Sequence, residues 1–229
     1  MKTYLAIGAH IGDMDLTAGP LLATAALAGH RTAIVALTPG ERGHPRMSPE
    51  DYKAQKIEEG RTFAEKIGAE FRVLDYSDGF LEATQEVSLQ VADIIRELKP
   101  DVIIAHWKNS IHSDHANASI IAERARYYAG LPMDHPLPRH GVGRFVYAEN
   151  WEDEEGFQPS LYVPIPDEAF ERWRDAISGQ AFARGETYGF RYIDYYTALM
   201  TMRGCLAGVP RACAFAVPSS STRDVVDLL

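Results

Sequence analysis

The chain has 229 residues, of which 46% are apolar and 24% are charged, as is usual for a globular protein. Its net charge of -9 arises from 32 acidic and 23 basic residues without a long basic block, so nucleic acid is not expected as a main partner. No signal-peptide pattern and no membrane-span-like apolar run appears, and two cysteines are too few for a disulfide framework, so we expect a cytoplasmic protein.

Strand and helix patterns alternate along the first two-thirds of the chain. Short apolar runs closed by turns predict strands at 4–8, 32–38, 71–74, 101–105, 145–148, 161–165 and 214–217. Helical spacing predicts helices at 17–29, 49–67, 83–98, 114–129, 167–178 and 190–203. This order favours an α/β fold, with a Rossmann-like, mostly parallel sheet, helices on both faces and a small C-terminal annex. We expect a single domain over 1–229, with a core of about 1–130 and a loop-rich part of about 131–229.

Polar clusters follow two of the predicted strands. His10 and Asp13 come directly after the first strand, and the stretch 106–115 after a later strand holds three histidines and an aspartate. Because the carboxyl ends of parallel strands meet at one edge of a sheet, we expect the two clusters to lie together. Each cluster alone also fits a turn histidine beside a helix cap.

A hydrolytic Zn²⁺ ion can be held by two imidazoles and one carboxylate, with its fourth coordination position left open for water or substrate. His10, Asp13 and His115 supply such a set, and His112 and Asp114 remain as acid–base or orienting groups. A metal in this setting lowers the pKa of its bound water and polarises a carbonyl oxygen. Fe²⁺, Mn²⁺, Co²⁺ and Ni²⁺ also suit these ligands.

Several motifs in the same order resemble those of the PIG-L/LmbE-like N-deacetylases. They are Ala9-His10-x-x-Asp13, Thr38-x-Gly40-Glu41-x-Gly43 and His112-x-Asp114-His115, with further matches at 56–59, 74–81 and 203–215. The resemblance implies a zinc-dependent amidohydrolase that acts on N-acetylglucosamine-type groups. It also implies a homo-oligomer, either a trimer or a hexamer.

The resemblance assigns roles to individual residues. It makes His10, Asp13 and His115 the zinc ligands. His112 becomes the group that stabilises the oxyanion or protonates the leaving amine, and Asp114 orients it.

Substrate binding is assigned to three further residues. These are Glu41, Arg42 and Lys56, the last in place of the family's usual arginine. A lysine lacks the two-pronged hydrogen bonding that an arginine offers to a phosphate or carboxylate.

The chain departs from the family pattern at the general base. The family motif reads His-Pro-Asp-Asp and uses its first aspartate as the base, whereas this chain has Ile11 and Gly12 there. Asp15 is our first candidate for a replacement base, and Asp114 and Glu41 are other carboxylates that could approach the water. The family's late glutamate is Cys213 here, which would place a thiol near the site.

Three functions remain open at this point. The first is a hydrolase that removes an acyl group, usually acetyl, from an N-acylated amino sugar or related amine. The second is a metal- and sugar-binding homologue that has lost catalysis together with the base. A nucleotide-dependent enzyme is disfavoured, since the turn at 8–12 lacks the glycine spacing that a pyrophosphate needs.

Two stretches outside these motifs have structural interpretations. The acidic stretch at 151–155 is typical of an exposed loop. The tyrosines at 188, 192, 195 and 196 fit a helix packing face or a subunit contact better than a sugar-binding platform.

Overall fold

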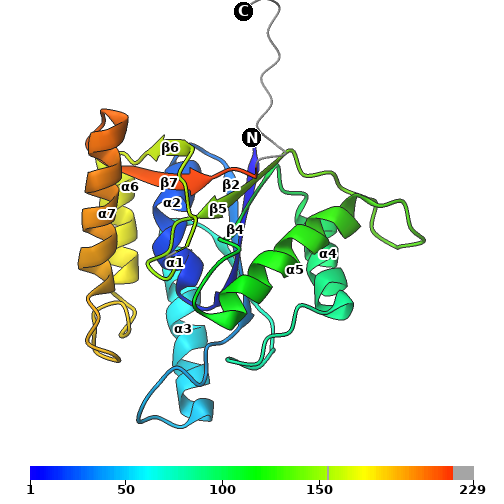
Figure 1. Ribbon diagram of the computed structural model, residues 1–229, viewed down its shortest axis with the longest axis horizontal. Coiled ribbons are helices and arrows are strands. Elements are labelled where there is room, and N and C mark those ends of the chain that lie inside the picture. Colours follow the sequence, from blue (N-terminus) through cyan, green and yellow to red (C-terminus); the bar gives the residue numbers. More distant parts are fainter. Residues whose placement is uncertain (154, 219–229) are drawn as a thin grey trace, which may run out of the picture.

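A computed structural model of the protein, described here for residues 1–153 and 155–218, contains one seven-stranded sheet (Figure 1). The strand order is β3-β2-β1-β4-β5-β7-β6. The first five strands in this order run parallel, and β7 is antiparallel to both of its neighbours. The strands are β1 (Thr3–His10), β2 (Arg31–Thr38), β3 (Glu70–Val73), β4 (Val102–His106), β5 (Arg144–Ala148), β6 (Leu161–Pro164) and β7 (Ala212–Ala216). The predicted α/β fold with a mostly parallel sheet is therefore confirmed.

Helices cover both faces of the sheet. The helices α4 and α5 share one hydrophobic core with the sheet, whereas α1, α2, α3 and α6 belong to a second core on the opposite face. The last helix, α7, packs beside β7 at one side of the molecule. The helices are α1 (Asp13–Thr17), α2 (Gly19–Leu27), α3 (Pro49–Ile67), α4 (Gln85–Leu98), α5 (Ser113–Gly130), α6 (Asp167–Ile177) and α7 (Tyr192–Ala207).

The helix after β1 begins earlier than the sequence pattern predicts. We expected one helix over 17–29, but α1 already starts at Asp13 and α2 follows it from Gly19. Gly12 has a φ of 110°, which lets the chain turn directly from the strand into α1. This early start places Asp13 on a helix, where its direction is fixed.

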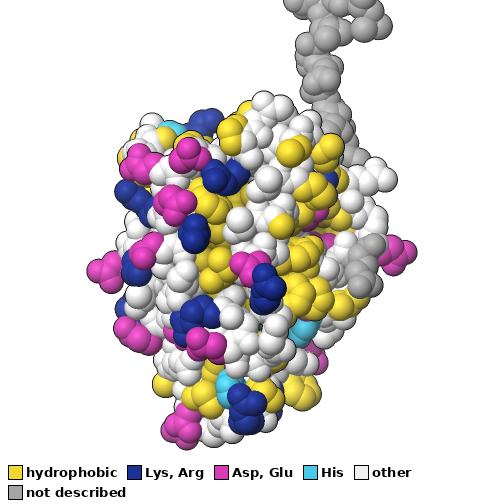
Figure 2. Space-filling view, turned by 90° about the vertical axis from the view of Figure 1, so that its left-hand side faces the viewer, with side chains coloured by type: hydrophobic (Ala, Val, Ile, Leu, Met, Phe, Trp, Pro, Cys, Tyr) yellow, Lys and Arg dark blue, Asp and Glu magenta, His cyan; other side chains and the backbone are white. Residues whose placement is uncertain are grey.

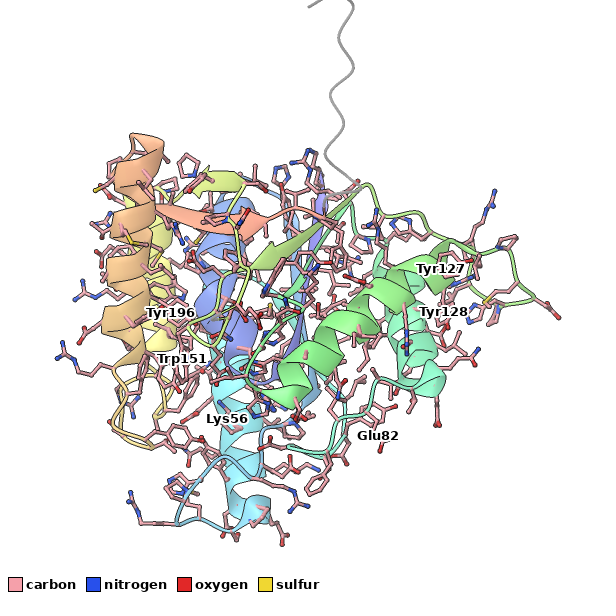
Figure 3. All side chains as sticks on the ribbon, viewed as in Figure 1. Lys56, Glu82, Tyr127, Tyr128, Trp151 and Tyr196 are labelled. Carbon is pink, nitrogen blue, oxygen red and sulfur yellow. The ribbon has the colours of Figure 1, made fainter. Side chains whose placement is uncertain are left out.

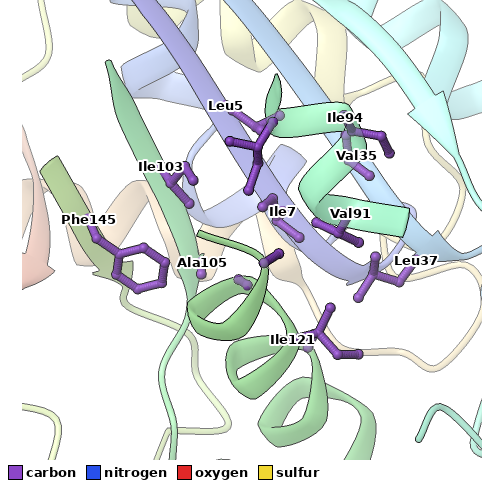
Figure 4. Packing of buried hydrophobic residues seen from close by; sticks show 14 of the residues in the cluster. Leu5, Ile7, Val35, Leu37, Val91, Ile94, Ile103, Ala105, Ile121 and Phe145 are labelled. Atoms are coloured by element: carbon purple, nitrogen blue, oxygen red, sulfur yellow. The ribbon is translucent and has the colours of Figure 1, made fainter. Parts of the chain in front are cut away.

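The core on the α4–α5 face holds the strands in register. Figure 4 shows buried side chains of three neighbouring strands meeting those of the two helices: Leu5, Ile7, Val35, Leu37, Ile103, Ala105, Val91, Ile94 and Ile121. Burial of each large aliphatic side chain contributes about 1.5–3 kcal/mol. This packing fixes the carboxyl ends of β1 and β4, from which the polar clusters project.

The strand order changes direction between β1 and β4. The chain leaves β1 toward one face through α1 and leaves β4 toward the other face through α5. Such a reversal opens a crevice at the carboxyl ends of the two strands. Both predicted polar clusters lie at this crevice.

The surface carries some exposed apolar side chains. On α7 these are Tyr195, Met202 and Leu206, and Figure 2, viewed from the side of α7, shows hydrophobic side chains among charged ones on this face. Among the described residues, no helix combines the length and apolarity that crossing a membrane requires.

Candidate active site

Three donor atoms from the two clusters converge at the crevice. His10 Nδ1 lies 3.3 Å from Asp13 Oδ2 and 3.2 Å from His115 Nε2, and the third side of this triangle, His115 Nε2 to Asp13 Oδ2, measures 3.4 Å. Two donors about 2.0–2.1 Å from a tetrahedral metal ion lie about 3.3–3.4 Å apart. The three atoms therefore have the spacing of one face of a tetrahedral metal site.

The charges at this triangle also favour a cation. Burial alone would lower the pKa of His115, but the Asp13 carboxylate raises it to about 9. Burial likewise opposes protonation of His10, yet Asp13 and Asp114 hold its pKa well above the usual range. Without a metal, protons on the imidazoles thus neutralise the carboxylates, and a divalent ion can replace them.

Two carboxylates hold the His10 ring in place. His10 Nε2 lies 3.0 Å from Asp78 Oδ1 and 3.2 Å from Asp114 Oδ2, which leaves Nδ1 turned toward the other two donors. Asp114 also accepts hydrogen bonds from the backbone N–H groups of Gly79 and Leu81, at 2.7 and 3.3 Å. The Asp114 carboxylate thus contacts the ring of His10, whereas the role that the resemblance gives it, orienting His112, stays a prediction.

The second imidazole is supported from the loop after β5. His115 Nδ1 lies 2.8 Å from Glu152 Oε2, so its Nε2 faces the other donors. On its other side, His115 stacks on the buried ring of His106, with centroids 4.1 Å apart. His106 Nε2 is in turn 3.1 Å from Asp13 Oδ2, and the backbone N–H of His10 donates to the same oxygen at 2.7 Å. Supporting contacts of this kind fix the direction of metal ligands and tune their basicity.

His112 stands beside the triangle with one nitrogen free. Its Nδ1 accepts a hydrogen bond from the backbone N–H of Asp114 at 3.2 Å, so the ring proton resides on Nε2. Burial and the neighbouring His10 lower the pKa of His112, which favours the neutral ring. A neutral imidazole held in this way presents an N–H donor to the pocket.

The triangle opens into a pocket of about 390 Å³. Its opposite wall is aromatic and consists of Tyr52, Trp151, Phe182, Tyr188, Phe190, Tyr192 and Tyr196. Trp151 stacks on Phe190 with centroids 4.9 Å apart, and Figure 3 shows Trp151, Tyr196 and Lys56 gathered from three separate elements. We call these seven residues the aromatic wall. They form the aromatic part of the pocket lining.

Gly12 marks the border between the triangle and the aromatic wall. A Cβ atom at this position would lie 2.4 Å from the Phe182 ring and 3.1 Å from Lys56 Nζ. The volume of a side chain at position 12 is thus already occupied by an aromatic ring and an amine. Among the described residues, the pocket has no carboxylate at this place.

The structure brings only part of the predicted set to the pocket. His10, Asp13, His112, His115 and Lys56 line it. Asp15, Glu41, Arg42 and Asp114 are absent from its lining, as is Cys213.

Asp15 points away from the pocket because of its position on α1. Residues two apart on a helix project about 200° from each other, so Asp13 and Asp15 face opposite sides. Asp15 is buried and accepts a hydrogen bond from Gln180 Nε2 at 2.6 Å. Burial raises its pKa to about 7.

Glu41 and Arg42 support the turn that carries Asp78. Glu41 Oε1 accepts from the backbone N–H of Asp78 at 3.0 Å, and the backbone N–H of Arg42 donates to Asp78 Oδ2 at 2.9 Å. Within the described residues, Glu41 and Arg42 thus hold Asp78, and Asp78 in turn contacts His10 of the donor triangle.

Comparison with known proteins decides the family. The model of the PIG-L family, described as GlcNAc-PI de-N-acetylase, matches residues 5–126. The chain belongs to the PIG-L family. The resemblance inferred from the motifs is thereby confirmed.

Named relatives of this PIG-L protein include both hydratases and deacetylases. The chain is 29% identical over 216 residues to 4-oxalmesaconate hydratase of Pseudomonas putida KT2440, covering 90% of this chain and 81% of the relative. It also resembles the solved 4-carboxy-2-hydroxymuconate hydratase of the same strain, with a TM-score of 0.88, 23% identity and full coverage of both chains. N,N'-diacetylchitobiose deacetylase of Pyrococcus horikoshii has a TM-score of 0.78 and 20% identity, with 95% of this chain and 84% of that chain covered.

Several pocket residues escaped the sequence analysis. The stretch at 151–155 was expected to be an exposed loop, but Glu152 is 14% exposed and contacts His115. Tyr188, Tyr192 and Tyr196 were expected to pack on a helix face, but they line the pocket. Neither stretch carries a motif, so no local signal distinguished these residues from surface or core positions.

Proposed function

We propose that this protein is a metal-dependent hydratase that adds water across the carbon–carbon double bond of a small unsaturated carboxylic acid. The observation that carries the proposal is the absence of a carboxylate at Gly12, where the Phe182 ring fills the space instead. The similarity to 4-oxalmesaconate hydratase over 90% of the chain supports the same reaction. Both hydratase names describe unsaturated polycarboxylic acids.

The two reactions known among the relatives place different demands on a site. Hydrolysis of an amide requires a base for the water and an acid that protonates the departing amine. Hydration of a double bond next to a carbonyl expels no group: the hydroxyl joins one carbon and the proton joins the other. Both reactions take a proton from water, but hydration has no departing amine to protonate, so it makes one demand fewer on a site in which position 12 offers no carboxylate.

His10, Asp13 and His115 are the proposed metal ligands. A divalent ion in this set, Zn²⁺ in our proposal, supplies a Lewis acid and lowers the pKa of a water molecule. Asp78 and Glu152, the other carboxylates that line the pocket, lie 3.0 and 2.8 Å from the imidazoles of His10 and His115. They keep the rings oriented.

His112 is the proposed electrophile. Its Nε2–H faces the pocket and can donate to the carbonyl oxygen that gains negative charge as the hydroxyl adds. The aromatic wall then covers the flat, conjugated part of the substrate, because aromatic rings pack well on planar unsaturated groups.

The second candidate is the zinc-dependent N-deacetylase expected from the motifs. The donor triangle and His112 favour it, since both fit that chemistry, and it would act on an N-acetyl amino sugar. A binding homologue without catalysis is the third outcome. Both remain alternatives that one set of assays separates.

The test uses the purified, zinc-loaded protein with two kinds of substrate. We expect loss of the ultraviolet absorbance of 4-carboxy-2-hydroxymuconate or 4-oxalmesaconate, and no release of amine from N-acetylglucosamine or N,N'-diacetylchitobiose. Amine release without hydration would overturn the proposal in favour of the deacetylase. Binding of these acids without turnover would favour the third outcome.

Three broader expectations also stay as proposals. We propose a single domain over 1–229, of which 154 and 219–229 lie outside the described residues. We further propose a homo-oligomer, to which the exposed apolar side chains of α7 would contribute, and a location in the cytoplasm.

A further inference from the structure

The Lys56 side chain is a cation buried at the pocket. It lies on α3, is 4% exposed and lines the pocket. None of the ion pairs within the described part of the chain involves it, and its Nζ lies 3.9 Å from the centroid of the Phe182 ring. An ammonium group removed from water costs free energy unless an anion accompanies it.

None of the carboxylates around Lys56 forms a hydrogen bond with its amine among the described residues, although Glu59 Oε2 is buried and has no hydrogen-bond partner there. Glu59 Oε1 accepts from Gln55 Nε2 at 2.9 Å and from the backbone N–H of Ala181 at 3.1 Å. Asp15 accepts from Gln180. The remaining two, Asp13 and Asp78, face the imidazoles of the triangle. Within the described part of the chain the Lys56 amine thus donates no hydrogen bond, and it can donate to a ligand in the pocket that it lines.

The position of this amine is as informative as its burial. Lys56 Nζ lies 3.1 Å from the point where a Cβ of residue 12 would stand, next to Asp13 in the chain. The family pattern gives position 12 to an aspartate. The family pattern also has a cation, an arginine, at position 56, so this chain keeps the positive charge at the edge of the donor triangle and lacks the negative charge beside it.

We propose that Lys56, held against Phe182 and above Gly12, binds a carboxylate of the substrate and selects acids over neutral amides. This inference rests on the proposed function and names the substrate group that the site recognises. A carboxylate at Lys56 lies beside the donor triangle, so the unsaturated carbons attached to it face His112 and the aromatic wall. Phe182 contributes twice, because it fixes the amine and also excludes a side chain at position 12.

The test measures binding of mesaconate, an unsaturated dicarboxylate, and of neutral N-acetylglucosamine to the zinc-loaded protein by calorimetry. We expect Lys56→Met to weaken mesaconate binding by roughly tenfold to a hundredfold, as is usual for a charge-assisted hydrogen bond, and Lys56→Arg to weaken it less. The matched control is Lys53→Met, one turn earlier on α3, where the lysine pairs with Asp75 at the surface. Mesaconate binding by this control is expected to be unchanged.

A second measurement needs no variant and therefore does not depend on folding. Mesaconate is expected to protect Lys56 of the wild type from amine-labelling reagents, as read by mass spectrometry, whereas N-acetylglucosamine is not. Equal mesaconate binding by wild type and Lys56→Met, or equal labelling with and without mesaconate, would show that Lys56 merely balances the charge of Glu59.

The outcomes separate this inference from the proposed function. If the wild type hydrates an unsaturated acid and Lys56→Met has the same KM for that acid, Lys56 does not bind the substrate carboxylate. The proposed hydratase function is then unaffected. If mesaconate binding depends on Lys56 but the protein hydrates none of the tested acids, the carboxylate subsite is supported. The proposed hydratase function is then overturned.

Discussion

The two sides of the pocket are built in different ways. The donor triangle comes from two short stretches, 10–13 and 112–115, which follow adjacent parallel strands and lie inside the region matched by the family model. The aromatic wall is assembled mainly from residues beyond 150, outside that region. Apart from Tyr52 on α3, its members come from the loop after β5, the segment between α6 and α7, and α7 itself.

This difference separates the chemistry from the choice of substrate. Strand ends are fixed by the sheet, so the backbone positions of the triangle depend little on the segments that cover it. The covering wall belongs to loops and a peripheral helix, which can change without disturbing the sheet. We therefore assign the shared metal chemistry of the family to the triangle, and the preference of this protein to the wall together with Lys56.

The largest expected effect comes from removing a donor of the triangle. His115→Ala should abolish stoichiometric metal binding and lower turnover on the order of 10³-fold, because two donors do not hold the ion. Metal content by mass spectrometry checks this, with His135→Ala as the control on a histidine that pairs with Asp93 instead. A variant that kept one metal per chain would contradict the assignment.

Glu152 joins the two sides, and its removal should have the next largest effect. Glu152→Gln weakens the orientation of His115, so we expect a tenfold to hundredfold loss of zinc affinity, as is typical for such supporting groups. Competition with a zinc chelator measures it. Glu155→Gln is the matched control, since the Glu155 side chain is exposed in the same loop. Equal affinities in the two variants would remove Glu152 from the metal centre.

The aromatic wall should influence binding without affecting the metal. Trp151→Ala removes the ring that stacks on Phe190, and we expect KM for the unsaturated acid to rise roughly threefold to tenfold while the metal content stays constant. Steady-state kinetics on Trp151→Ala and on the exposed control Tyr127→Ala checks this. A change in metal content instead would mean that the wall also holds the triangle.

The smallest expected effect concerns the pH dependence of the free energy of unfolding, to which Asp153 contributes. Burial raises the pKa of Asp153 to about 7, so between its ordinary value and 7 the folded state binds a proton that the unfolded state has lost. The free energy of unfolding therefore falls as pH rises through this window and levels off above it. Asp153→Asn removes this dependence and should raise Tm at pH 8 by about 2–4 °C.

Thermal unfolding at pH 5 and pH 8 measures this difference. The control is Asp134→Asn, at an exposed position of the loop after α5. If Asp153→Asn unfolded at a lower temperature than the wild type at both pH values, the hydrogen bond from the Asn150 backbone to Asp153 would matter more than its charge.

The sequence alone determined the elements and the half of the site that contains the donor triangle. Apolar runs and helical spacing are local patterns, so they predicted every strand and helix of the described chain within a few residues, apart from the early start of α1. Since parallel strands end at a common edge, the order of elements was enough to bring His10, Asp13 and His115 together.

Only the tertiary structure decided the other half of the site. The direction of a side chain depends on the turn of helix that carries it, which is why Asp15 faces Gln180 while Asp13 faces the pocket. Glu152 and the tyrosines of the aromatic wall lie in segments without periodicity, whose placement follows from packing against α1, α3 and the sheet. The contact of Lys56 and Phe182 over Gly12 joins three distant segments, and long-range packing of this kind leaves no local pattern in a single sequence.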